Sequence, residues 1–272
     1  MEFSLKFWGV RGSFPSGNSQ IAKHTSCVEL DLGEGHSVFF DAGTGLHPAT
    51  LNRKFKKLSI CLSHFHWDHI QGFPFLNGLH QNEMEIEIIS GFPDAFERLS
   101  VLFDERFHPV PADFLKDRVT FRIMEPGQSL ALPRDLKLSL APLNHPGISF
   151  AFRLDGKLSN FVYATDSDYD PVTIEAEKLL RQADYVVMDS QFLVGDSFSK
   201  AHYGHASFKH SIDVAARHRV RHSILYHFDP NYSDEEIFLM EAQALDYSRK
   251  TYGDEGPKII LAREDQGLQI PL

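Results

Sequence analysis

Three histidines and an aspartate lie within six residues of one another, directly after an apolar run. The apolar run is Leu58–Leu62, and the polar residues are His64, His66, Asp68 and His69. Because side chains two residues apart on an extended chain point the same way, His64 and His66 can reach one metal ion together. Asp68 and His69 follow where the chain turns, and they can reach a second ion nearby. The run therefore predicts a metal centre at the end of a buried strand.

Three further predicted strands end directly before a residue that can bind a metal. These residues are His145, Asp166 and His227, and the strands before them span 136–143, 160–165 and 222–226. Sites in sheet proteins usually lie at the C-terminal ends of strands, so we expect these residues to join the histidine-rich run. Seven ligands are enough for three histidines on one ion, two histidines and Asp68 on the other, and Asp166 bridging both. Imidazole and carboxylate groups suit zinc, manganese, iron or nickel, so the ligand types alone do not name the ion.

The order of predicted elements along the 272-residue chain changes from strands alone to mixed strands and helices. Short β-branched or aromatic runs predict strands at Phe3–Trp8, Cys27–Leu32, Ser37–Asp41, Leu58–Ser63, Glu85–Ser90, Val119–Met124, Leu136–Leu143, Ser149–Leu154, Asn160–Thr165, Asp184–Met188 and His222–Tyr226. Helical patterns occur at Phe92–Leu102, Thr173–Gln182, Phe208–Arg217 and Ser233–Tyr252. Ser207 and Ser233 stand at expected N-caps.

This order of elements predicts an α/β fold with four layers, an αββα sandwich of two packed sheets with helices on the outer faces. The chain contains no internal repeat, low-complexity run or linker, so we expect a single domain over residues 1–272. The aromatic-rich segment 93–116 does not fit a clear pattern, and we treat it as an insertion without fixed boundaries.

Several motifs resemble those of one known family. The H-x-H-x-D-H pattern followed by Gly72 is similar to the signature of the metallo-β-lactamase superfamily. Its phosphodiesterase branch contains ribonuclease Z, phosphoribosyl 1,2-cyclic phosphate phosphodiesterases and cyclic-nucleotide phosphodiesterases. The segments that resemble this branch are Trp8–Ser13, Thr25–Cys27, Phe40–Gly45, Tyr163–Asp166, Met188–Gln191, Tyr203–Ser207 and Tyr226–Pro230.

The resemblance implies how the ligands are shared between two divalent ions, of which zinc is the expected species. It assigns His64, His66 and His145 to one ion, Asp68, His69 and His227 to the other, and Asp166 to both. It also implies a phosphodiesterase in which a hydroxide that bridges the metals attacks phosphorus.

His205 and Asp189 are expected to act in catalysis together with Asp68. Asp189 ends a predicted strand one strand along from Asp166, and it can accept a hydrogen bond from His205. A carboxylate behind an imidazole favours the charged form of the ring, which suits a general acid that protonates a leaving alkoxide. The resembling family uses an acidic residue and a histidine in this way at these two places.

Two other residues have open interpretations. Asp41 closes a predicted strand, where it either orients the loop that contains His64 and His69 or forms a turn. Arg11 either meets a substrate phosphate or lies on the surface.

We predict a phosphodiesterase that acts on a small cyclic phosphate, either a cyclic nucleotide or a phosphoribosyl cyclic phosphate. An RNA-processing nuclease like ribonuclease Z is the first alternative. A noncatalytic metal-binding sensor module of the same fold, and a thioesterase or lactonase of the same superfamily, remain further alternatives. The sequence contains no Pro-rich flexible arm of the kind that long ribonuclease Z proteins use to grip transfer RNA.

The amino-acid composition limits which molecules this protein is expected to bind. The net charge of −10 argues against a chain that wraps nucleic acid, so we expect a small anionic phosphodiester as the substrate and no nucleic acid. Cys27 and Cys61 lie in strand-like runs and are expected to be buried free thiols of a cytoplasmic protein. No apolar stretch is long enough to predict a membrane span. From the resemblance we also expect a homodimer.

Overall fold

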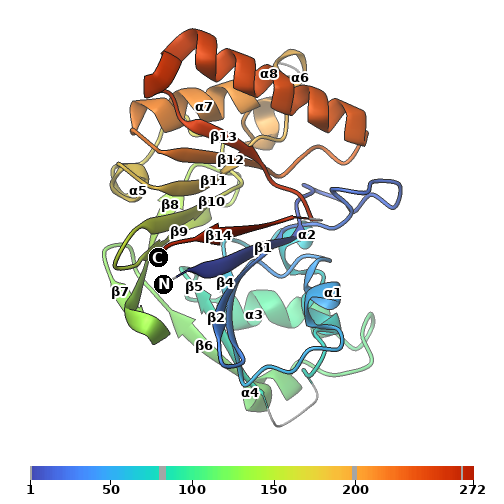
Figure 1. The fold of residues 1–272 in the computed structure, drawn as a ribbon. Coiled ribbons are helices and arrows are strands. Elements are labelled where there is room, and N and C mark those ends of the chain that lie inside the picture. The colour runs from blue at the N-terminus through green and yellow to red at the C-terminus, as the bar shows by residue number, and fades with distance from the viewer. Residues whose placement is uncertain (1, 80–83, 198–200, 265) are drawn as a thin grey trace.

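Two seven-stranded sheets pack face to face in the computed structural model, and helices cover the outer face of each sheet (Figure 1). The structure describes residues 2–79, 84–197, 201–264 and 266–272. The predicted αββα sandwich is confirmed. Both ends of the chain lie close together at neighbouring strands of the first sheet (Figure 1). No helix within these ranges is both long and apolar enough to cross a membrane.

The first sheet has the strand order β14-β1-β2-β3-β4-β5-β6. Its strands are β1 (Phe3–Gly9), β2 (Cys27–Gly33), β3 (His36–Phe40), β4 (Lys57–Leu62), β5 (Glu85–Ser90), β6 (Val119–Ile123) and β14 (Gly267–Ile270). Strands β14, β1, β2 and β3 pair antiparallel, whereas β3 to β6 run parallel. The parallel strands place their C-terminal ends at one edge of the sheet.

The second sheet repeats this plan with the order β13-β12-β11-β10-β9-β8-β7. Its strands are β7 (Ser129–Leu132), β8 (Leu136–Leu143), β9 (Ser149–Asp155), β10 (Asn160–Ala164), β11 (Tyr185–Asp189), β12 (His222–Tyr226) and β13 (Lys258–Leu261). Strands β7 to β10 pair antiparallel, and β10 to β13 run parallel. This sheet therefore also presents several C-terminal strand ends together.

The helices divide between the two outer faces (Figure 1). They are α1 (Leu46–Thr50), α2 (Trp67–Ile70), α3 (Ala95–Ser100), α4 (Phe114–Arg118), α5 (Ile174–Leu180), α6 (Val194–Ser197), α7 (Phe208–Arg217) and α8 (Asp234–Tyr252). Short 3-10 turns lie at Phe73–Phe75, Val101–Phe103, Pro133–Asp135, Ala201–Tyr203 and Gly253–Glu255. Ser207 and Ser233 cap α7 and α8 as predicted, since each side chain accepts a backbone N–H of the first turn.

Three apolar clusters hold these layers together. The largest lies between the sheets and joins Phe7 of β1 to Phe152 of β9 and Phe161 of β10. A second cluster packs α1 and α3 on the outer face of the first sheet, and a third packs α5 and α7 on the outer face of the second. Burial of apolar surface is the main favourable term in folding, so these clusters fix the strand ends that carry the polar residues.

Most predicted strands and helices are present, with differences at short or irregular elements. The four-residue strands β7, β13 and β14 were not predicted, because four residues contain too little alternation to stand out. The predicted helix at 92–102 is shorter and continues as a 3-10 turn. Segment 93–116 forms most of the connection from β5 to β6, and it buries Leu99, Phe103 and Leu115 in the outer cluster of the first sheet.

Candidate metal centre

The seven residues that the sequence predicted as ligands come together beyond the C-terminal ends of four strands. His64 follows β4, His145 follows β8, Asp166 follows β10 and His227 follows β12. Asp41, which follows β3, has a φ of 61°, and the φ angles of Asp166 and His227 are 57° and 67°. Non-glycine residues adopt such left-handed angles at a cost in free energy, and they tend to do so at functional sites. The chain turns sharply at each strand end and directs the polar side chain into a common space.

Four of the residues form one compact group: Asp68, His69, Asp166 and His227. The Nε2 atom of His69 lies 3.2 Å from Asp68 Oδ2 and 3.1 Å from Asp166 Oδ2. The Nε2 atom of His227 lies 3.2 Å from Asp68 Oδ2 and 3.2 Å from Asp166 Oδ1. The two Nε2 atoms are 3.3 Å apart. Four ligands that bind one ion at about 2.0–2.1 Å in tetrahedral geometry are about 3.3 Å from one another, so the group has the dimensions of a metal site.

The second group contains His64, His66 and His145, and Asp166 lies between it and the first group. His145 Nε2 is 3.2 Å from His66 Nδ1, and His64 Nε2 is 3.6 Å from Asp166 Oδ2. His66 is exposed, whereas His64 and His145 are buried. This group is therefore the one that opens towards solvent, and Asp166 is placed where it contacts both groups.

The electrostatics of the cluster fit a cation. Burial opposes the ionisation of Asp68 and Asp166, but the neighbouring histidines hold the pKa of both carboxyls well below the usual range. Burial lowers the pKa of the His69 ring, but Asp166, Asp68 and Asp41 raise it well above its ordinary value. Among the described residues, the buried Nε2 of His64 has no hydrogen-bond partner. Buried polar atoms are nearly always paired. The lone pairs of these carboxylate oxygens and imidazole nitrogens point towards one another, and a divalent metal ion between them would supply the positive charge that stabilises this arrangement.

Asp41 holds the metal-binding loop in place and does more than form a turn. Its buried carboxylate accepts hydrogen bonds from Ser63 N at 2.7 Å, Ser63 Oγ at 2.8 Å and Tyr163 Oη at 2.8 Å. It also accepts a hydrogen bond from His69 Nδ1 at 2.7 Å. A bond to Nδ1 fixes the tautomer and leaves Nε2 of His69 facing the other ligands.

His205 and Asp189 form the predicted pair beside the cluster. His205 Nδ1 donates to Asp189 Oδ2 at 2.7 Å. The Asp189 carboxylate also accepts backbone N–H groups of Ser167, Gln191 and Ala206 at 3.1–3.3 Å, so it is held firmly. Burial lowers the pKa of His205, but contact with Asp189 raises it to about 9. The ring is therefore charged at neutral pH and leaves Nε2 as the nitrogen that can donate elsewhere.

A cavity of about 460 Å³ opens beside these residues. Its lining is Ser13, His66, His145, Pro146, Gln191, Phe192, His202, Tyr203, His205, Asp229, Pro230 and Asn231. Gly12 lies so close to the cluster that a Cβ there would be 2.6 Å from the His227 ring. Next to it, Ser13 N donates to Asp68 Oδ2 at 2.7 Å. The loop after β1 therefore forms part of the site, and Gly12 and Ser13 were given no role there from the sequence.

Arg11 does not lie on the surface, which excludes one of its two interpretations. It is fully buried, and it donates to the carbonyls of Ala22 and Asp229. The bond to Asp229 ties the loop after β1 to the segment that follows β12, so Arg11 positions a wall of the cavity. Gln191 was given no role from the sequence, although it ends the segment Met188–Gln191 and follows Asp189 by two residues.

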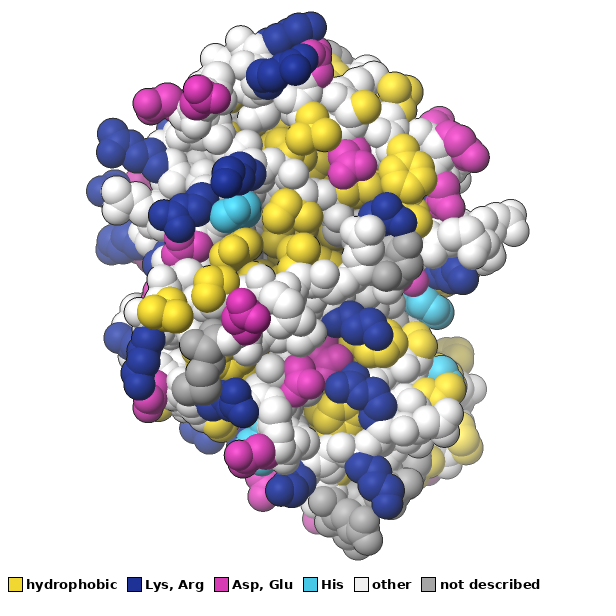
Figure 2. All heavy atoms as spheres, in the orientation of Figure 1, with side chains coloured by type: hydrophobic (Ala, Val, Ile, Leu, Met, Phe, Trp, Pro, Cys, Tyr) yellow, Lys and Arg dark blue, Asp and Glu magenta, His cyan; other side chains and the backbone are white. Residues whose placement is uncertain are grey.

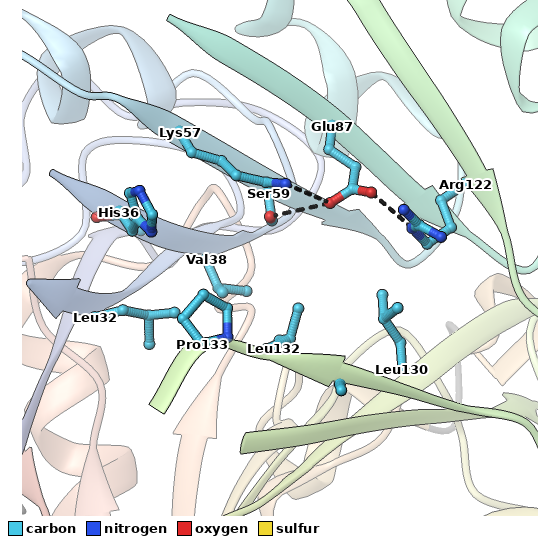
Figure 3. Close-up of a pocket in the computed structure, with 12 residues that line it drawn as sticks. Leu32, His36, Val38, Lys57, Ser59, Glu87, Arg122, Leu130, Leu132 and Pro133 are labelled. Carbon is cyan, nitrogen blue, oxygen red and sulfur yellow. Dashed lines mark hydrogen bonds and ion pairs between the residues drawn. The ribbon is translucent and has the colours of Figure 1, made fainter. Parts of the chain in front are cut away.

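A second cavity, of about 100 Å³, lies at the opposite ends of the strands (Figure 3). Four of its polar side chains contact one another. Glu87 Oε1 accepts from Arg122 Nε at 2.6 Å, and Glu87 Oε2 lies 3.5 Å from Lys57 Nζ and 3.4 Å from Ser59 Oγ (Figure 3). A self-contained ion-pair network of this kind does not indicate a ligand, so the histidine-lined cavity is the candidate site.

Comparisons with known proteins identify the family and the fold of this chain. A family model described as a beta-lactamase superfamily domain matches residues 36–228. A ribonuclease Z of Nitrosopumilus maritimus is 33% identical, and the match covers 89% of this chain and 94% of the relative. The metallo-beta-lactamase fold protein YhfI of Bacillus subtilis aligns over 99% of both chains with a TM-score of 0.75 at 17% identity. Unliganded yeast PDE1 aligns over 99% of both chains with a TM-score of 0.72 at 12% identity.

The fold and the histidine–aspartate cluster together define a metal-binding hydrolase of the metallo-β-lactamase fold. Within that class, the chain belongs to the beta-lactamase superfamily and to its family of metal-dependent phosphodiesterases and nucleases. The predicted superfamily and enzyme class are confirmed. The expectation that nucleic acid is not a partner loses support, because the relative is by name a ribonuclease.

Proposed function

We propose that this chain hydrolyses a small cyclic phosphate, and that it does so with two divalent metal ions. The observation that carries the proposal is that His66 and His145 of the seven-residue cluster line one cavity together with His205, which is hydrogen-bonded to Asp189. The volume of about 460 Å³ falls within the range of about 300–1,000 Å³ typical of small-molecule sites. The proposed substrate is either a cyclic nucleotide or a phosphoribosyl cyclic phosphate.

The proposed ligand sets follow the two groups described above. His64, His66 and His145 would hold one ion, Asp68, His69 and His227 the other, and Asp166 both. Zinc is the ion proposed here, since it binds imidazole and carboxylate ligands. When bound, the two ions supply Lewis-acid activation of water and of the phosphodiester.

The proposed role of His205 is to move a proton. As the oxygen of a hydroxide ion bonds to phosphorus and the ester P–O bond breaks, the leaving oxygen gains negative charge. His205 Nε2 donates its proton to that oxygen, while Asp189 holds the Nδ1–H and stabilises the charged ring beforehand. A ring nitrogen of His205 lies within 4.8 Å of ligand atoms of both His145 and Asp166. A phosphodiester bound at the proposed metal site would therefore lie within reach of His205.

Charge favours a small substrate over a long RNA. The net charge is −10, and Figure 2 shows basic and acidic side chains interspersed on the face drawn, without a continuous basic surface there. Nucleic-acid surfaces are usually strongly positive, since phosphate contacts supply much of the affinity. A ribonuclease Z-like nuclease is the second candidate, and the 33% identical relative of that name supports it.

A substrate panel tests the proposal. Metal-loaded protein should hydrolyse cyclic nucleotides or phosphoribosyl 1,2-cyclic phosphate faster than it cleaves precursor transfer RNA. Asp166→Ala should abolish hydrolysis of bis-p-nitrophenyl phosphate, whereas Asp113→Ala, at an exposed residue of the surface, should not change it. Cleavage of the RNA alone would favour the nuclease. Activity on thioesters or lactones without any on phosphodiesters would show that the proposal is wrong.

A further inference from the structure

We propose that the cavity beside the metal centre contains a subsite for a nucleobase, formed by Tyr203 and Gln191. The inference rests on the proposed function and deepens it, because it selects a nucleotide over a phosphoribose without a base. Two independent features of the cavity wall support it: an exposed aromatic ring, and a buried amide without a partner for its oxygen among the described residues.

Tyr203 presents its ring to the cavity although 54% of the residue is exposed. The backbone of the next residue is held in place, since the carbonyl of Gly204 accepts a hydrogen bond from His145 Nδ1 at 3.0 Å. Gly204 has a φ of 76°, and a Cβ there would lie 2.3 Å from Pro146 Cδ. The Tyr203 backbone therefore lies next to a proposed metal ligand, and its ring lies 4.3 Å from the ring of His202, centroid to centroid. An exposed aromatic face of this kind is suited to stack on a planar ring.

Gln191 contributes the polar part of the wall. It is 3% exposed, and its Nε2 donates to Ser13 Oγ at 3.2 Å. Its buried Oε1 has no hydrogen-bond partner among the described residues. Exchanging the amide oxygen and nitrogen would leave an N–H group unpaired in the same place, so the need for a partner does not depend on that assignment. Buried polar groups are nearly always paired, which indicates a ligand group or water at this wall.

The chemistry of the two residues defines the ligand class. A ligand that satisfies both needs a planar face for Tyr203 and a hydrogen-bonding edge for Gln191, and every nucleobase has both. Pro146 and Pro230 add apolar surface to the lining. A ribose phosphate without a base has neither a planar face to stack on Tyr203 nor a base edge to pair with the Gln191 amide oxygen. Among the proposed substrates, the cavity therefore fits a cyclic nucleotide.

Two substrates that differ only in the base test the subsite. These are adenosine 2′,3′-cyclic phosphate and 1-O-methylribose 2,3-cyclic phosphate. The metal-loaded wild type should prefer the nucleotide in kcat/KM by about 5- to 150-fold, the equivalent of about 1–3 kcal/mol for one stacked base. Tyr203→Ala should bring the ratio close to one, and Tyr203→Phe should restore it. Gln191→Leu should lower the ratio, whereas the control Phe107→Ala, at an exposed ring outside the cavity lining, should not.

Calorimetry supplies a readout that does not depend on turnover. AMP should bind more tightly than ribose 5-phosphate, and Tyr203→Ala should remove the difference while metal content stays unchanged. Equal Kd values for the two ligands in the wild type, or an equal loss on both cyclic phosphates in Tyr203→Ala, would overturn the subsite and leave the phosphodiesterase proposal standing. If neither cyclic phosphate is hydrolysed but AMP still binds more tightly, the proposed reaction fails and the subsite stands.

Discussion

Replacement of Asp41 by asparagine should weaken metal binding although Asp41 touches no metal in the proposed site. Its Oδ2 accepts three hydrogen bonds, from His69, Ser63 Oγ and Tyr163, and its Oδ1 accepts one from Ser63 N. The best orientation of an asparagine keeps oxygen at the Oδ2 position, so its NH₂ group faces the Ser63 N–H. At least one hydrogen bond to a charged group is then lost, which costs about 1.5–3 kcal/mol, and the other three become weaker.

The free energy of unfolding of metal-free Asp41→Asn, measured by urea denaturation, should therefore fall by at least about 1.5 kcal/mol. Zinc affinity, measured by competition with a chelator, should fall about 10- to 100-fold, because the His69 ring loses the partner that orients it. Asp94→Asn is the matched control, since Asp94 lies at the surface and pairs with Arg98 only. Wild-type zinc affinity in Asp41→Asn would refute the argument that this carboxylate orients His69.

Three further predictions concern the proton donor, a buried carboxyl and the oligomeric state. His205→Ala should keep its metal content and lose about 10²- to 10⁴-fold in turnover on a cyclic phosphate, with a smaller loss on p-nitrophenyl esters; equal losses would exclude the acid role. Burial raises the pKa of Glu264 to about 7 from 4.5, so the folded state retains a proton that the unfolded state releases. The wild type thus loses stability as pH rises through this window, and Glu264→Gln should gain about 1–3 kcal/mol relative to it between pH 5 and 8 in denaturation curves. We predict a homodimer in which exposed apolar residues such as Val101 and Phe107 contact the partner. Light scattering should then give twice the chain mass of 30.9 kDa, and a mass of 30.9 kDa would reject the dimer.

The ligand positions were predictable because local sequence determines them. A buried apolar run sets the direction of each strand, and the polar residue that follows lies at its C-terminal end, as with His64 after β4 and His227 after β12. The predicted strands that end at Asp41 and Thr165 run one residue longer than β3 and β10. The left-handed φ angles of Asp41 and Asp166 turn the chain out of the strand at those points, and the residue types alone do not reveal such angles.

The cavity wall was not predictable in the same way, because contacts between distant segments build it. Arg11 reaches the carbonyl of Asp229, 218 residues away, and Gln191 reaches Ser13, 178 residues away. An arginine in a Gly-flanked loop is usually exposed, and only the packed loop after β1 makes this one buried. Residues of this kind depend on tertiary structure, whereas the histidine-rich run depends mainly on its own strand.

The number of metal ions per chain tests the central claim most directly. Elemental analysis of gently purified, metal-replete protein should show close to two equivalents of divalent metal, because the described cluster contains two ligand groups, and Asp166 of one group lies 3.6 Å from His64 of the other. Asp166→Ala should lower that number while far-UV circular dichroism stays unchanged. A stoichiometry that remains at one under metal-replete conditions would contradict the bridging position of Asp166 and the two-metal site.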